Sequence, residues 1–137
     1  MWSGINIPGT GVAVDQTWLN TIGGNIANMN DAVTPGKPLY RAEYVVAQEQ
    51  ASANGVSNSG IGNGVQVEAI ALGPAKGTMQ YQPGNPLANA QGEVEYPVVN
   101  VGSQIADLVQ AQISYQANAQ VMANARTSYA SILNIKA

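Results

Sequence analysis

The longest continuous pattern of hydrophobic positions covers residues 101–135, which contain no proline and only two charged side chains, Asp107 and Arg126. Large apolar residues recur there at alternating spacings of three and four, with Gln112, Ala119 and Arg126 in the remaining places. This spacing predicts a coiled-coil-like seam on a helix about 50 Å long. Its apolar members are Ile105, Leu108, Tyr115, Met122, Tyr129 and Leu133.

A second apolar line makes the surface of this predicted helix broader than one partner helix covers. The intervening positions are mostly Gln, Asn, Ser and Ala, where a solvated face would carry Glu and Lys. Neutral polar groups can be buried with hydrogen bonds and avoid the desolvation cost of a charge. We therefore expect protein on several sides of this helix. The second line consists of Val109, Ile113, Ala117, Val121, Ala125 and Ile132.

A second helix is predicted near the N-terminus, beginning at Thr10 or Gly11. Asp15 would then lie near its positive end, where a carboxylate is favourable. Asn28 and Asn30 are candidate terminators, because Asn tolerates the left-handed conformation. Trp18 stands beside the predicted seam, which consists of Val12, Leu19, Ile22, Ile26 and Met29.

The predicted N-terminal helix is too short to cover its partner. It offers about twenty residues against about thirty-five, so roughly a third of the long seam has no partner within the chain at about 1.5 Å per residue. We expect neighbouring copies to bury the rest, because the apolar side chains of such a hairpin offset too little conformational entropy.

The middle of the chain has β-strand and turn patterns. Turns are indicated at Pro35-Gly36 and at residues 83–86, strands at 39–48 and 65–72 with a further short strand at 78–82, and an extended segment at 94–99. The predicted fold is mainly α with a small β insertion, in which the terminal helices pair as an antiparallel coiled-coil-like hairpin. Residues 1–31 and 100–137 would form a discontinuous helical assembly domain, and residues 32–99 a β-rich and loop segment.

Composition narrows the possible functions. Charged residues make up 9% of the chain and the net charge is −3, which argues against nucleic acid as a partner. His and Cys are absent, which removes the commonest general base and the usual metal ligands. Glu93 and Glu95 could be an acid/base pair, but their spacing on an extended segment favours a solvated strand face. We expect no enzyme activity, cofactor, metal or small-molecule substrate.

Two targeting features are missing from the sequence. No stretch reaches the roughly 18 apolar residues of a membrane span. Residues 1–8 lack the basic opening and apolar run of a cleavable secretory signal. A route out of the cytoplasm would therefore be of another kind.

Motifs in both predicted helices resemble those of the bacterial flagellar axial proteins, the family of rod, hook and filament-type subunits. Trp18-Leu19 and Asn25-Ile26-Ala27-Asn28 are similar to the family's N-terminal signature. Four segments of this chain resemble the C-terminal signature of proximal rod members of the family. They are GNPLANAQG at 84–92, YPVVNV at 96–101, Asp107-Leu108 and the segment 111–118. The chain departs from the family pattern at Gly24, Val98, Gln104 and Gln112.

The resemblance implies a rod subunit of the flagellar basal body, spanning the periplasm and exported by the flagellar type III apparatus without a cleaved signal. Its partners would be copies of itself and other rod proteins, with the MS ring and export gate nearby. The terminal helices would line a hollow, torque-transmitting tube that passes exported subunits. A second hypothesis is a secreted helical binding module, either an adhesin or an export-system effector.

Residues 51–64 are rich in Ser, Asn and Gly and have no hydrophobic periodicity, which predicts a flexible loop. A short Gly-Ser insertion in this segment should leave assembly intact, because it displaces no packing residue. Swimming of cells that carry the insertion variant tests this. Loss of assembly would show that the segment contacts a neighbour.

Overall fold

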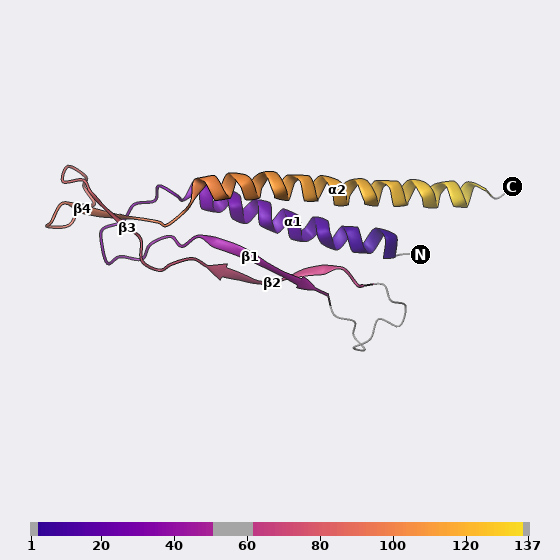
Figure 1. The fold of residues 1–137 in the computed structure, drawn as a ribbon, viewed down its shortest axis with the longest axis horizontal. Coiled ribbons are helices and arrows are strands. Elements are labelled where there is room, and N and C mark those ends of the chain that lie inside the picture. Colours follow the sequence, from indigo (N-terminus) through magenta and orange to yellow (C-terminus); the bar gives the residue numbers. More distant parts are fainter. Residues whose placement is uncertain (1–2, 51–61, 136–137) are drawn as a thin grey trace.

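The computed structural model describes residues 3–50 and 62–135. Its elements are α1 (Ser3–Ala27), β1 (Glu43–Glu49), β2 (Val65–Leu72), β3 (Thr78–Tyr81), β4 (Glu93–Tyr96) and α2 (Val101–Asn134). The two helices run antiparallel, with the β1–β2 hairpin along α1 and the β3–β4 hairpin beyond the end where α1 stops and α2 starts (Figure 1). The predicted fold class is confirmed.

Helix α1 is longer at its N-terminal end than the sequence pattern predicted. It begins at Ser3 and includes Pro8, although the prediction placed its start at Thr10 or Gly11. Proline in a helix removes one hydrogen bond, here the one to the carbonyl of Gly4, and the helix nevertheless extends back to Ser3. The early start places Asp15 in the middle of the helix, so its predicted role at the helix start is wrong.

The predicted end of α1 is confirmed, but the reason differs. The Asn28 side-chain Nδ2 donates to the carbonyl oxygen of Gly24 at 2.8 Å, and the Asn28 backbone N–H donates to the same oxygen at 3.1 Å. No residue other than glycine has a positive φ in the described ranges. The helix therefore ends through a side-chain hydrogen bond and not through a left-handed Asn.

Strand β1 pairs antiparallel with β2, with a bulge between Val46 and Ala47. The predicted strand at 39–48 was too long at its start, because the ladder reaches its limit where Glu43 pairs with Leu72. Beyond that pair, Gly73 N–H donates to the Ala42 carbonyl oxygen at 2.7 Å. The predicted bounds of β2 are confirmed. Most of the predicted loop at 51–64 lies outside the described residues.

Glu95 on β4 is buried, with 6% of its surface exposed. Its Oε1 accepts from Gly77 N–H at 2.8 Å and its Oε2 from Gly36 N–H at 3.4 Å. A Cβ at Gly77 would lie 2.3 Å from the Tyr96 carbonyl oxygen, so only glycine permits this approach. The expectation that Glu95 belongs to a solvated strand face is wrong, since the carboxylate joins two turns to β4.

Helix α2 begins at a capped end, where Asn100 Oδ1 accepts from Ser103 N–H at 3.1 Å. The N-terminal end of α1 lies opposite the C-terminal part of α2, with Gly4 close to the Tyr129 hydroxyl. Because α1 starts early, it has 25 residues against the 34 of α2, and the C-terminal part of α2 still extends beyond it (Figure 1). The expected uncovered part of the seam is therefore present, but it is shorter than the predicted third. In the described part of the chain, neither helix is long and apolar enough to cross a membrane.

The Asn25 side chain, 1% exposed, connects α1 to both α2 and β1. Its Nδ2 donates to the Gln104 Oε1 and to the Glu43 carbonyl oxygen, both at 2.8 Å. Its Oδ1 accepts from Glu43 N–H at 2.8 Å and from the Tyr40 hydroxyl at 2.9 Å. The amide thus bonds both backbone groups of Glu43, as a neighbouring strand would.

Asn25→Asp should destabilise the fold by about 3 kcal/mol or more, because a carboxylate cannot donate to Gln104 and Glu43 and is buried as a charge. Asn30→Asp makes the same chemical change at an exposed position and should shift the free energy of unfolding by less than about 0.5 kcal/mol. Urea unfolding of both variants measures the difference. Similar losses in the two variants would contradict the role assigned to Asn25.

The Tyr40 hydrogen bond should make stability sensitive to alkaline pH. Burial raises the pKa of the Tyr40 hydroxyl above its ordinary value, and the Glu43 carboxylate raises it further. A group whose pKa is raised by folding contributes stability below its unfolded pKa of about 10, and this is lost as pH rises through the folded pKa. The stability advantage of wild type over Tyr40→Phe should therefore shrink above about pH 10. Urea unfolding over this range checks it, and a constant difference would contradict it.

Candidate assembly interface

The face of α2 that meets α1 has buried or half-buried residues at alternating spacings of four and three. We call this set the inner seam. Half of its positions carry large side chains and the other half carry Ala, Asn or Gln. The inner seam consists of Gln104, Leu108, Ala111, Tyr115, Asn118, Met122, Ala125 and Tyr129.

The structure divides the predicted seam of the long helix. Leu108, Tyr115, Met122 and Tyr129 lie on the inner seam. Ile105 and Leu133 do not, and they are 52% and 78% exposed. The sequence pattern gave weight to large apolar residues and so chose the column containing Ile105, whereas α1 packs on the column containing Gln104 and Ala111.

The predicted residues of the N-terminal helix all lie at least partly out of solvent. Ile22 is buried, and the others are half-buried between α2 and the β1–β2 hairpin or at the end of α1. Gln16, which lies four residues after Val12 and three before Leu19 of this seam, is exposed, whereas Asp15 beside it is buried. The half-buried residues are Val12, Trp18, Leu19, Ile26 and Met29.

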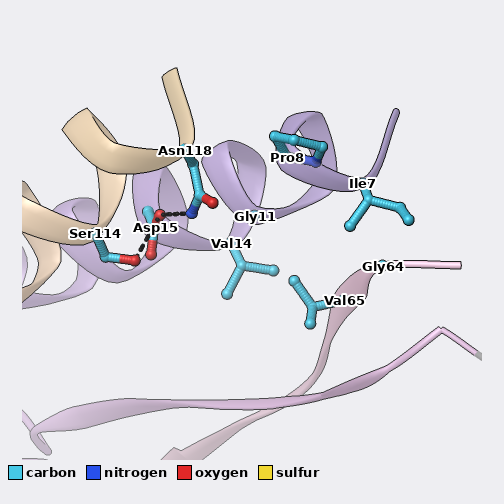
Figure 2. A pocket seen from close by; sticks show the side chains of 9 residues that line it. All are labelled: Ile7, Pro8, Gly11, Val14, Asp15, Gly64, Val65, Ser114 and Asn118. Carbon is cyan, nitrogen blue, oxygen red and sulfur yellow. Dashed lines mark hydrogen bonds between the residues drawn. The ribbon is translucent and has the colours of Figure 1, made fainter. Parts of the chain in front are cut away.

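Small and polar residues on the inner seam allow the helices to approach closely. A Cβ at Gly11 would lie 2.7 Å from the Asn118 Nδ2, so the glycine makes room for the amide. Asn118 Nδ2 donates to Asp15 Oδ2 at 2.8 Å, and Ser114 Oγ donates to the same oxygen at 3.1 Å (Figure 2). These bonds and the Asn25–Gln104 bond join α1 to α2 at two levels. The sequence signal for them was the neutral polar residues within an otherwise apolar helix.

Large apolar side chains are exposed on α2, along its length away from the inner seam and at its two ends. We call this set the outer face. Four members, Val109, Ile113, Val121 and Ile132, come from the predicted second apolar line, and Ile113 is 62% exposed. Ile105, Val109, Ile113, Ala117 and Val121 follow one another at intervals of four and form a ridge along the helix, and an exposed apolar surface of this kind is typical of a protein interaction site. The outer face consists of Val101, Ile105, Val109, Ile113, Val121, Ile132 and Leu133.

The fully buried apolar side chains are few. In the described part of the chain they are Ile22, Ala42, Val94 and Ala111, whereas five polar or charged residues are equally buried. The described residues include no group of three or more His, Cys, Asp or Glu that could hold a metal ion. The described residues therefore form surfaces suited to packing, and buried polar side chains fix the register of the two helices by hydrogen bonds.

Comparisons with known proteins identify the family. Residues 90–135 match the family described as flagellar basal body rod FlgEFG protein C-terminal. The flagellar basal-body rod protein FlgC of Salmonella typhimurium is 34% identical over 117 residues, which cover 85% of this chain and 84% of that protein. FlgC of Yersinia enterocolitica is 35% identical over the same shares. FlgC of Agrobacterium fabrum is 34% identical over 131 residues, or 94% of this chain and 90% of that protein. The chain belongs to the FlgC family of flagellar basal-body rod proteins.

Proposed function

We propose that this chain is a structural subunit of the flagellar rod and that copies of it pack against one another and against other rod proteins through α2. The observation that carries the proposal is the outer face, an exposed apolar surface on a helix with only two charged residues. Burial of apolar surface is the dominant favourable contribution to most protein association. A helix that was solvated in its working state would carry Glu and Lys on this side.

The proposal assigns different roles to two sets of residues on α2, the inner seam and the outer face. The inner seam and the facing residues of α1 hold the subunit together, and the outer face, which includes Ile105 and Leu133, contacts neighbours. Residues 1–31 and 100–137 form the assembly domain in this proposal, and residues 32–99 face outward. The assembled helices form a hollow shaft that transmits torque and passes exported subunits.

The same proposal gives the location and partners. The subunit lies in the basal body across the periplasm, near the MS ring and the export gate, and it reaches this place by the flagellar export route without a cleaved signal. Its role is mechanical and not enzymatic. The small apolar core supports a chain that gains much of its stability on incorporation. The alternative of a secreted binding module has no support, since the relatives that match over most of the chain are rod proteins.

Ile113→Asp should abolish assembly and swimming while the isolated chain still folds, because the side chain is 62% exposed in one copy. A charge buried in a subunit interface without a partner costs several kcal/mol, roughly a hundredfold or more in affinity. Recovery of the variant in purified basal bodies, relative to the amount expressed, measures assembly. Circular dichroism of the isolated chain measures folding.

Two matched variants complete this test. Ile113→Leu keeps an apolar side chain of similar volume and should assemble normally. Leu108→Asp, on the inner seam, should unfold the hairpin itself and lower the helical signal of the isolated chain. Normal assembly of Ile113→Asp would contradict the proposed role of the outer face.

A further inference from the structure

The sequence contains the dipeptide Asn-Gly twice, at residues 54–55 and 63–64. The first pair lies outside the described residues, whereas Asn63 and Gly64 lie directly before β2. Asparagine is a thermolabile residue, and glycine after it lacks the Cβ that would hinder contact between the side-chain carbonyl carbon and the next backbone nitrogen. The surroundings of Asn63 therefore decide whether the folded chain loses this side-chain amide.

Asn63 and Gly64 precede the paired part of the β1–β2 hairpin. The Asn63 side chain is exposed, and the first residue of β2 in the ladder is Val65, which pairs with Glu49. Gly64 accepts at its carbonyl oxygen from Gln50 N–H at 2.8 Å, but its own N–H donates to no described residue. The Asn63 carboxamide and the Gly64 nitrogen are thus both outside the hydrogen-bonded ladder.

The attachment of β2 to α1 requires glycine at position 64. Gly64 has a φ of +100°, in the left-handed region that favours glycine, and a Cβ there would overlap the Thr10 hydroxyl. That hydroxyl accepts from Val65 N–H at 3.0 Å and donates to the Ile7 carbonyl oxygen at 2.7 Å. Gly64 and Val65 lie beside the first turns of α1 (Figure 2). The fold therefore keeps glycine after Asn63, and with it the labile pair.

Two other asparagines provide internal controls, because each lacks one of these conditions. Asn85 precedes Pro86, whose nitrogen carries no hydrogen. Asn30 is exposed like Asn63, but it precedes Asp31, which has a side chain and whose N–H donates to the Asn28 carbonyl oxygen at 3.1 Å. Neither pair should react at the rate of Asn63-Gly64.

We propose that Asn63 is a site of spontaneous deamidation in the folded chain. The Gly64 nitrogen loses its proton to hydroxide and attacks Asn63 Cγ, so that a new carbon–nitrogen bond closes a cyclic imide and the side-chain nitrogen leaves as ammonia. Water then opens the ring. Hydrolysis at one imide carbonyl gives aspartate, and hydrolysis at the other gives isoaspartate, in which the main chain runs through the former side chain. This inference does not depend on the proposed function.

Either product adds a carboxylate where β2 meets α1, so the formal net charge of −3 becomes one unit more negative. The new charge remains in water, because position 63 is exposed, and a surface substitution of this kind has little effect on stability. Asn63→Asp should therefore fold as wild type does. It provides an authentic standard for the aspartate product.

Peptide mapping by mass spectrometry of the purified full chain, incubated at neutral and at alkaline pH, tests the proposal. The peptide that contains Asn63 should lose its amide progressively, and faster at the higher pH, because the attacking nitrogen must be deprotonated. Asn30 and Asn85 should keep their amides over the same time. Fragmentation of the peptides separates a change at residue 63 from one at residue 54.

Two further measurements identify the products. One acidic species should coelute with fresh Asn63→Asp on ion exchange, and an isoaspartate-specific methyltransferase should label a second species. Asn63→Ser, the matched control, has no carboxamide at this position and should give neither product there. Labelling at residue 63 in that variant would overturn the proposal.

Incubation in guanidinium chloride separates the contribution of the fold from that of the dipeptide. Asn63 should deamidate at a similar rate in the folded and the unfolded chain, because the fold leaves the reacting groups outside the ladder. Conversion only in the unfolded chain would show that the fold protects the pair, and would overturn the proposal. Retention of the Asn63 amide throughout, or equal loss at Asn30, would overturn it as well.

Discussion

The four hydrogen bonds of the Asn25 amide are the interaction on which the arrangement of this subunit depends. They join three segments that are distant in the sequence, since Asn25 bonds Gln104 on α2, both backbone groups of Glu43 on β1 and the Tyr40 hydroxyl. An apolar residue at this place could fill the space but could not specify which atoms meet. Because a buried amide tolerates few geometries, it selects one register of α1 against α2 and one position of the hairpin.

The inner seam follows from the same constraint. Two levels of side-chain hydrogen bonds, at Asn25–Gln104 and at Asp15 with Ser114 and Asn118, require the helices to lie close together. Close approach is possible because the positions between the large residues are small, such as Ala111 and Gly11. The cost is a small apolar core, because half of the inner seam carries small or polar residues while large residues such as Ile105, Val109 and Ile113 are exposed. In the proposed assembly, neighbouring subunits bury the apolar side chains of α2 that a single subunit leaves exposed.

The scarcity of charge has a role in this organisation. A helix with neighbours on several sides cannot carry Glu and Lys on its outer surface without desolvating them. Gln, Asn and Ser retain hydrogen bonding at a smaller cost. The charged residues of the two helices are accordingly only Asp15, Asp107 and Arg126.

The sequence by itself determined the helices, the strand at Val65–Leu72, the fold class and the resemblance to flagellar axial proteins, because these depend on local periodicity and on motifs that lie close together along the chain. It also indicated that one partner helix would not cover α2. The candidate site was only partly predictable. The pattern identified Leu108, Tyr115, Met122 and Tyr129, but it placed Ile105 and Leu133 in the same seam, since large apolar residues dominate a periodicity count.

Only the tertiary structure decided which column of α2 meets α1. The deciding residues are polar or small, and their place depends on hydrogen bonds to residues far away in the sequence, as Gln104 bonds Asn25 and Asn118 bonds Asp15. The same reason explains Glu95, which looked solvated beside Glu93 but is buried by turns at Gly36 and Gly77. A pattern of residue types records how often apolar positions recur, whereas a buried polar group is placed by its partners.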